Sequence, residues 1–95
     1  MSESLTDSEL AQIEIRATLA TAGPWQSFVE GRDHTSGDSF IRTGGLDDSS
    51  PDLYVSFALT GSMKPAGSDD LDFIAASRQD VVRLVAEVRR LRALV

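Results

Sequence analysis

The sequence contains no cysteine, and histidine, lysine, tryptophan and tyrosine each occur only once. Without thiols the chain forms neither disulfides nor thiolate metal sites, which is typical of proteins from a reducing compartment. It also lacks any run of about 18 apolar residues, so no helix is expected to span a bilayer. The first ten residues, MSESLTDSEL, carry acidic side chains where a secretory signal would carry basic ones. We therefore expect a cytoplasmic protein without a membrane segment.

Basic residues are scarce, with nine Lys and Arg against fifteen Asp and Glu, which gives a formal net charge of −6. This balance argues against nucleic acid as a partner, because neutralising phosphates requires clustered Lys and Arg. Residues 1–72 hold thirteen acidic and four basic side chains, whereas residues 73–95 hold two acidic side chains and five arginines. These arginines either pair with the acidic body or an acidic partner, or lie solvated near a helix C-terminus, where the helix dipole favours them.

The chain length of 95 residues and the 41% hydrophobic composition fit one globular domain, 1–95, with a single modest core. A first helix is predicted to begin after Thr6, because Thr6 and Glu9 have the spacing of a capping box. Apolar residues at helical spacing continue to Ala20, and Gly23-Pro24 then stops the helix.

The last third of the chain is also predicted to be helical, with Ser68 as its N-cap. A second Ser-x-x-Asp start signal, Ser77 to Asp80, predicts a break, which divides this region into helices over 69–76 and 81–94. The longer helix carries an apolar stripe formed by Val81, Leu84, Val88, Leu91 and Val95. Val82 and Val85 widen this stripe beyond a coiled-coil seam, which suits a helix that lies on a sheet.

Three segments are predicted to be strands, namely 25–31, 39–43 and 52–60. The third shows the clearest alternation of apolar and polar residues, which predicts one packed face. Segments 46–52 and 61–70 are rich in turn-forming residues and are interpreted as connectors. The fold class is therefore α+β, in the order α-β-β-β-α(α). A three-stranded antiparallel sheet is flanked by an N-terminal helix and a broken C-terminal helix that cover one face.

The loop GRDHTSGDSF, residues 31–40, connects the first two strands and contains the single histidine. If the first strand continues into this loop, Arg32 and His34 share one face of the strand and Asp33 lies on the other. Arg32 and His34 would then form an electropositive pocket together with Arg42 and Arg78. Arginine is well suited to binding phosphate or carboxylate. The candidate ligand- or partner-binding residues are Arg32, Asp33, His34, Ser36, Arg42 and Arg78. Alternatively the stretch is only a hairpin connection, in which Gly31 and Gly37 adopt positive φ.

No catalytic residue, metal site or cofactor is expected. The hydroxyl groups near His34 lack the additional base and orienting group that a nucleophile requires. The spacing of Asp47, Asp48 and Asp52 matches no metal-binding loop.

Three stretches, GPW, EGRDHTSGDSFIRTG and DFIAASRQDVVRLVAEVRRLRA, lie within residues 23–94. They resemble recurring pieces of a family of small, mostly uncharacterised bacterial and phage proteins, with a GRDHTSG loop and a C-terminal DxxFIAxxRQD helix. The resemblance implies a strand-rich middle followed by a helix, and it implies no activity. Such sequences have a proline after RQDV, where this chain has Val82.

Two functional hypotheses follow. The first is a non-catalytic intracellular interaction module, of the immunity or inhibitor type, that binds a partner protein. The second is a protein that binds a small nucleotide-like anion through the Arg32, His34 and Arg42 region. Self-association through the C-terminal helix is expected to be compatible with either hypothesis, because the apolar stripe extends to Val95.

Overall fold

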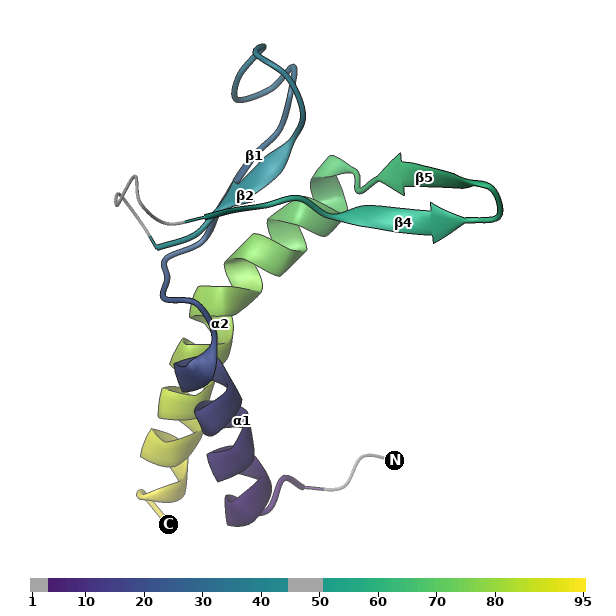
Figure 1. Cartoon of the computed structure of the whole chain (residues 1–95). Helices are drawn as coiled ribbons and strands as arrows, with labels where there is room; N and C mark the ends of the chain where they lie inside the picture. Colours follow the sequence, from purple (N-terminus) through teal and green to yellow (C-terminus); the bar gives the residue numbers. More distant parts are fainter. Residues whose placement is uncertain (1–3, 45–50) are drawn as a thin grey trace.

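The computed structural model of the chain describes residues 4–44 and 51–95 (Figure 1). In chain order the elements are α1 (Asp7–Leu19), β1 (Gln26–Phe28), β2 (Phe40–Arg42), β3 (Asp52–Leu53), β4 (Ser56–Leu59), β5 (Ser62–Pro65) and α2 (Ser68–Arg92). The predicted α+β class, with a three-stranded antiparallel sheet between two terminal helices, is confirmed. A second sheet of two strands, β4 and β5, was not predicted.

Helix α1 begins where the sequence predicts. The Thr6 hydroxyl accepts a hydrogen bond from the Glu9 N–H at 3.0 Å, and the Glu9 carboxylate accepts one from the Thr6 N–H at 2.8 Å. The second of these bonds favours the ionised carboxylate, so the pKa of Glu9 lies below its ordinary value. The helix ends before Gly23-Pro24, which is joined by a cis peptide bond.

Helix α1 packs against the C-terminal half of α2 and not against the sheet (Figure 1). Leu10 is buried there, and ion pairs join Arg89 to Glu14 at 3.0 Å and Arg92 to Asp7 at 2.8 Å. Two of the C-terminal arginines therefore pair with acidic residues of the same chain. The expectation that both helices cover the sheet is wrong, because α2 alone contacts it.

Helix α2 is continuous over 25 residues, so the predicted break at Ser77 to Asp80 is wrong. The Ser77 hydroxyl donates to the Phe73 carbonyl one turn earlier, and it does not cap a new helix. The first half of α2 packs on the sheet and the second half packs on α1. Because tertiary contacts supply most of a helix's stability, these two contacts stabilise the helix through the predicted break. The N-cap is Gly67, not Ser68, and no side chain caps this end.

The apolar stripe predicted for the second half of α2 is also partly wrong. Leu84 and Leu91 are 63% and 50% exposed, whereas Val85, which widens the predicted stripe, is buried. The prediction assumed a sheet beneath this part of the helix, but α1 lies there and covers a narrower face.

The three-stranded sheet has the order β1-β2-β3, and all its neighbours are antiparallel. Ile41, at its centre, is fully buried and forms the core with Ala66, Leu71 and Ala75. Because side chains alternate along a strand, Phe40 and Arg42 lie on the opposite face, which we call the outer face. Phe28 is the register partner of Phe40 and shares that face.

The predicted third strand, 52–60, is divided between two sheets. Asp52 and Leu53 pair with β2, after which the chain leaves that sheet and β4 pairs with β5. Val55 packs against the core as expected, but the packed face is wrong for the second half of the segment, because Phe57 and Leu59 are 48% and 51% exposed. The predicted connector 61–70 contains β5 and the start of α2. Alternation identifies an extended chain, but it does not identify the neighbouring strand.

Hairpin β4–β5, residues 56–65, projects away from the rest of the molecule, and we call it the arm (Figure 1). Every residue in it is exposed. Among the described elements, its two strands contact only each other. In the described part of the chain, neither helix combines the length and the apolar character that crossing a bilayer requires.

Candidate binding surfaces

Arg32 joins the loop to α2. Its guanidinium forms a bidentate pair with the Asp72 carboxylate, through Nη1 at 2.8 Å and Nη2 at 2.9 Å. It also contacts the carboxylate of Asp33 at 2.9 Å. Ser27, on the helix side of β1, donates its hydroxyl proton to the same Asp72. Arg32 therefore holds the loop to α2, and two carboxylates balance its charge.

These hydrogen bonds favour the charged forms of all three groups. The bonds from Arg32 and Ser27 lower the pKa of Asp72 to about 2. Arg32, together with the Val29 N–H, lowers the pKa of Asp33, and the two carboxylates raise the pKa of Arg32. Asp33 Oδ2 accepts from the Val29 N–H at 2.8 Å, so Asp33 also closes the turn that begins the loop.

The turn determines where the loop residues point. Gly31 and Gly37 have φ values of 85° and 129°, as the hairpin interpretation predicts. The N–H groups of Arg32 and Asp33 both donate to the Val29 carbonyl, so the first strand does not continue through the loop. The expectation that Arg32 and His34 share a strand face, with Asp33 opposite, is therefore wrong. Arg32 and Asp33 are in contact.

His34 packs against the aromatic side chains of the outer face. Its ring centroid is 5.5 Å from that of Phe40, and its Nδ1 lies 3.3 Å from the Ser36 N–H, which donates to it. Its Nε2 atom is buried and has no hydrogen-bond partner within residues 4–44 and 51–95. Ser36 thus binds one ring nitrogen, while the other is buried without a hydrogen bond to any described residue.

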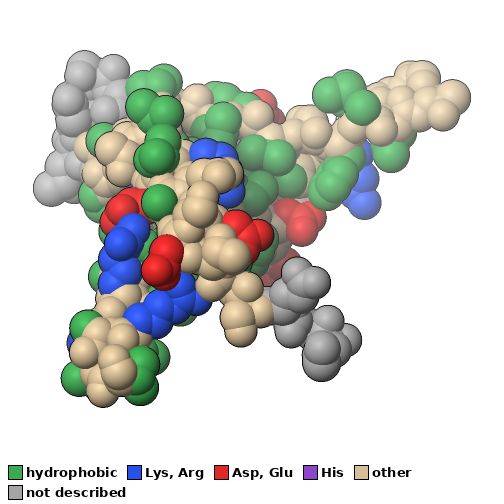
Figure 2. All heavy atoms as spheres, turned by 90° about the horizontal axis from the view of Figure 1, so that it is seen from below, with side chains coloured by type: hydrophobic (Ala, Val, Ile, Leu, Met, Phe, Trp, Pro, Cys, Tyr) green, Lys and Arg blue, Asp and Glu red, His purple; other side chains and the backbone are tan. Residues whose placement is uncertain are grey.

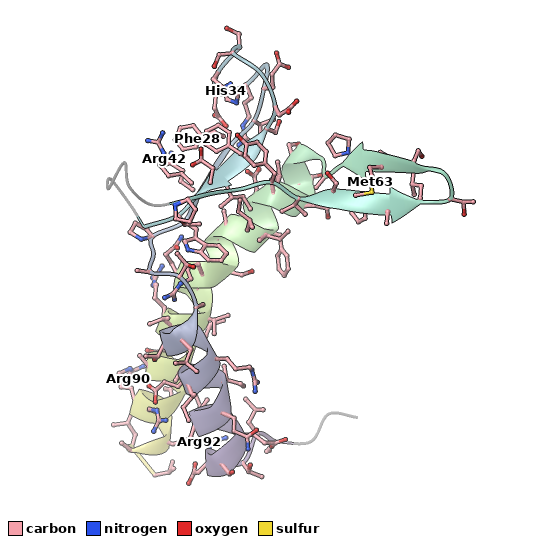
Figure 3. All side chains as sticks on the ribbon, viewed as in Figure 1. Phe28, His34, Arg42, Met63, Arg90 and Arg92 are labelled. Atoms are coloured by element: carbon pink, nitrogen blue, oxygen red, sulfur yellow. The ribbon has the colours of Figure 1, made fainter. Side chains whose placement is uncertain are left out.

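Arg42 belongs to the same face. Its guanidinium lies 5.2 Å from the centroid of the Phe28 ring, within cation–π distance. Phe28 and Phe40 stack with centroids 5.4 Å apart, and Tyr54 follows at 5.9 Å from Phe40. Figure 3 shows His34 in the loop above Phe28 and Arg42. The outer face is therefore a continuous row of rings with a cation at one end.

Arg78 lies elsewhere. Its Nε donates to the Thr21 carbonyl at 2.9 Å, which ties α2 to the segment after α1.

Of the predicted residues, the structure brings His34, Ser36 and Arg42 to the aromatic row. It places Arg32 and Asp33 with Asp72 on the helix side of the sheet, and Arg78 beside Thr21. The predicted electropositive pocket with all of these cations does not form.

A second apolar surface lies between the helices. A groove of about 530 Å³ is lined mainly by apolar side chains, namely Ile13 and Ala17 of α1, Trp25, and Phe73, Ile74 and Val81 of α2. The polar side chains of Arg16, Ser77 and Arg78 complete its lining. Phe73, one of the lining residues, is 75% exposed. Trp25 is held there by its neighbour Gln79, which accepts from the Trp25 N–H at 2.7 Å and donates to its carbonyl at 3.1 Å.

Sequence reasoning missed the aromatic row, the arm and the groove. Alternation in Phe40-Ile41-Arg42 was sufficient to place Phe40 and Arg42 on one face. Adding Phe28 and Tyr54 required the strand register, which depends on loop length and tertiary contacts. The role of Gln79 carries no local signal, since a glutamine on a helix is ordinarily a solvated residue.

Comparison of the chain with protein-family models, with curated proteins and with solved structures finds no match. The resemblance to bacterial and phage proteins with a GRDHTSG loop therefore stays a prediction.

Proposed function

We propose that this chain is a non-catalytic interaction module that binds a partner protein through the outer face of its three-stranded sheet. The observation that carries the proposal is the row of stacked rings, Phe28, Phe40 and Tyr54, with Arg42 at one end. Tyrosine, other aromatic residues and arginine are enriched in the residues that dominate protein–protein affinity.

The arrangement of the row favours binding. Tyr54 is 59% exposed, so a large part of its ring remains free to contact a partner. The rings already rest against one another and against His34, so binding immobilises few additional rotamers. The neighbouring loop is held to α2 by the Arg32–Asp72 pair, which fixes its position beside the row. The surface is thus organised before a partner arrives.

The class that we propose is an immunity- or inhibitor-type protein of the cytoplasm. Its support is the small size, the net charge of −6 and the lack of cysteine, together with an open sheet face beside a charged loop. Such a protein acts by covering a surface of its target, and it requires no chemistry of its own. For self-association, the C-terminal helix is an alternative interface to the one proposed below, since Leu84 and Leu91 are exposed there.

The test uses immobilised chain and lysate from the organism that encodes it. We expect the wild type to retain a protein at a near-stoichiometric level, and we expect Tyr54→Ala combined with Arg42→Ala to lose most of it. Gln12→Ala, at an exposed position on α1, is the matched control and should retain the protein. Retention that is equal for all three chains, or absent from all three, would overturn the proposal.

A second candidate function is binding of a small nucleotide-like anion beside Arg42. It is favoured by the Nε2 atom of His34, which is buried without a partner among the described residues. Arg32 does not support it, because Asp33 and Asp72 already neutralise that guanidinium. A thermal-shift screen with phosphate and nucleotides tests it, because a ligand at 100 times its dissociation constant adds about 2.7 kcal/mol of stability. The absence of any shift, or an equal shift in Arg42→Ala, would exclude this candidate.

A further inference from the structure

The arm carries apolar side chains that nothing in the described part of the chain covers. Phe57, Leu59 and Met63 are 48%, 51% and 66% exposed. The register pairs Phe57 with Lys64 and Leu59 with Ser62, so these four side chains share one face, while Ala58 and Met63 share the other. Isolated two-stranded hairpins are marginally stable in water, because they bury little surface. A contact from outside the chain would supply the missing burial.

The chain exposes enough surface for such a contact. A compact monomer of 10.2 kDa is expected to expose about 5,300 Å². This chain exposes 7106 Å², and its radius of gyration is 16.5 Å where about 12 Å is expected. The excess is about 1,800 Å² per chain, which is more than the roughly 800 Å² that each partner buries in a standard interface.

The chain also has a concave surface that fits the arm. The groove between α1, Trp25 and α2 is mainly apolar, and the ring of Phe73 lies exposed in it. Its α2 residues run from Phe73 to Val81, towards the middle of the helix, whereas the arm precedes the first residue of α2 (Figure 1). Figure 2 looks at the molecule from below, and it shows hydrophobic side chains on the side of the arm that overlooks the helices. One chain thus carries both the arm and a groove that could receive the arm of another copy.

We propose that two copies of this chain form a two-fold symmetric dimer by exchanging their arms. The Phe57 and Leu59 face of each arm packs into the groove of the other copy, beside Phe73. A two-fold interface requires a surface that is complementary to itself. In an arm exchange each copy supplies one arm and one groove, so the same contact forms twice. A partner of another sequence would need only one of the two features. This proposal uses surfaces other than the outer face of the sheet, so it goes beyond the proposed function.

The first experiment measures the mass of the purified chain by sedimentation over a range of concentrations. We expect the wild type to have twice the chain mass of 10.2 kDa. Phe57→Asp combined with Leu59→Asp places charges in the interface, and we expect the dissociation constant to rise by at least about 100-fold. The arm contacts no other helix or strand of the described residues, so circular dichroism should show that this variant keeps its helices.

Leu84→Asp is the matched control, because Leu84 is exposed on α2 outside both the arm and the groove. It should remain a dimer. A wild type that is monomeric at every concentration would overturn the proposal. A dimer that dissociates only in Leu84→Asp would place the contact on the C-terminal helix, and would overturn it as well.

The second experiment tests which surfaces meet, and it uses the fact that the chain has no cysteine. A tagged Leu59→Cys chain is mixed with an untagged Phe73→Cys chain under oxidising conditions. Arm exchange predicts a disulfide between the two different chains. A cross-link between two Leu59→Cys chains alone would show that the arms pair with each other, and would overturn the groove as the receiving surface.

The outcomes also separate this proposal from the proposed function. The double aspartate variant keeps the outer face, so it should still retain the partner protein, whereas Tyr54→Ala with Arg42→Ala should still form dimers. Failure of either proposal therefore leaves the result for the other intact.

Discussion

Asp72 lies where the loop and α2 meet, although Arg32 is forty positions away in the sequence. Both side chains are about half exposed, so the pair organises the loop more than it stabilises the fold. Local residue patterns predicted the turn in the loop, including the positive φ of Gly31 and Gly37. They did not predict the partner of Arg32, because the sequence does not show which carboxylate the folded chain brings within reach.

The first prediction concerns the pH dependence of this pair. The pKa of Asp72 is about 2 in the folded chain and 3.8 ordinarily, so the ionised carboxylate stabilises the fold above about pH 4. That contribution is lost as the pH falls towards 2. Asp72→Asn lacks it, so its stability should fall less steeply than that of the wild type between pH 4 and pH 2. Urea unfolding at one chain concentration measures the difference.

A double-mutant cycle of Arg32→Gln and Asp72→Asn provides the control. The two substitutions should have non-additive effects on the free energy of unfolding at pH 6. Their effects should become additive as the pH falls towards 2. Coupling that is independent of pH would show that the two residues interact by packing and not by charge.

The second prediction concerns Gln79, whose amide forms hydrogen bonds to both backbone groups of Trp25. Gln79→Leu leaves a half-buried N–H and carbonyl without partners, so the free energy of unfolding should fall by about 1–3 kcal/mol. Gln12→Leu, an exposed change on α1, should have little effect on the urea midpoint. Equal effects of the two substitutions would show that the bonds to Trp25 contribute nothing.

At the scale of helices and strands, an element is predicted correctly where residues close together in the sequence determine it. The start of α1 depends on Thr6 and Glu9 alone, and it was predicted correctly. The same kind of signal at Ser77 to Asp80 failed, because contacts with the sheet and with α1 extend the helix through it. The division of 52–60 between two sheets was not predictable, since strand alternation is the same whichever neighbour is present.

The third prediction tests the capping box of α1. Thr6→Ala removes the acceptor for the Glu9 N–H, and a loss of about 1 kcal/mol in the free energy of unfolding is expected. Thr18→Ala is the matched control, because the Thr18 hydroxyl only donates to the Glu14 carbonyl within the same helix. Urea unfolding that shows no difference between the two would mean that α1 frays at its start without cost to the fold.

At the scale of the whole molecule, the described chain resembles two structural units joined by α2. One end of α2 carries the sheet and the arm, and the other end carries α1 (Figure 1). Few apolar side chains are buried in the described residues, and many large ones are exposed. A small core gives marginal stability, so a second copy that buries the exposed side chains would contribute a large part of the total.

The fourth prediction follows from this dependence on a second copy. If folding and arm exchange are coupled, unfolding separates two chains, and the melting temperature must rise with chain concentration. For a dimer of this size the rise should be about 3 to 5 °C for each tenfold increase. Calorimetry over two decades of concentration measures it. Phe57→Asp with Leu59→Asp should melt at a lower temperature that does not depend on concentration, because its arm no longer binds another copy. A wild type with a concentration-independent melting temperature would show that each chain folds without its neighbour, and that the arm is exposed to solvent in the stable protein.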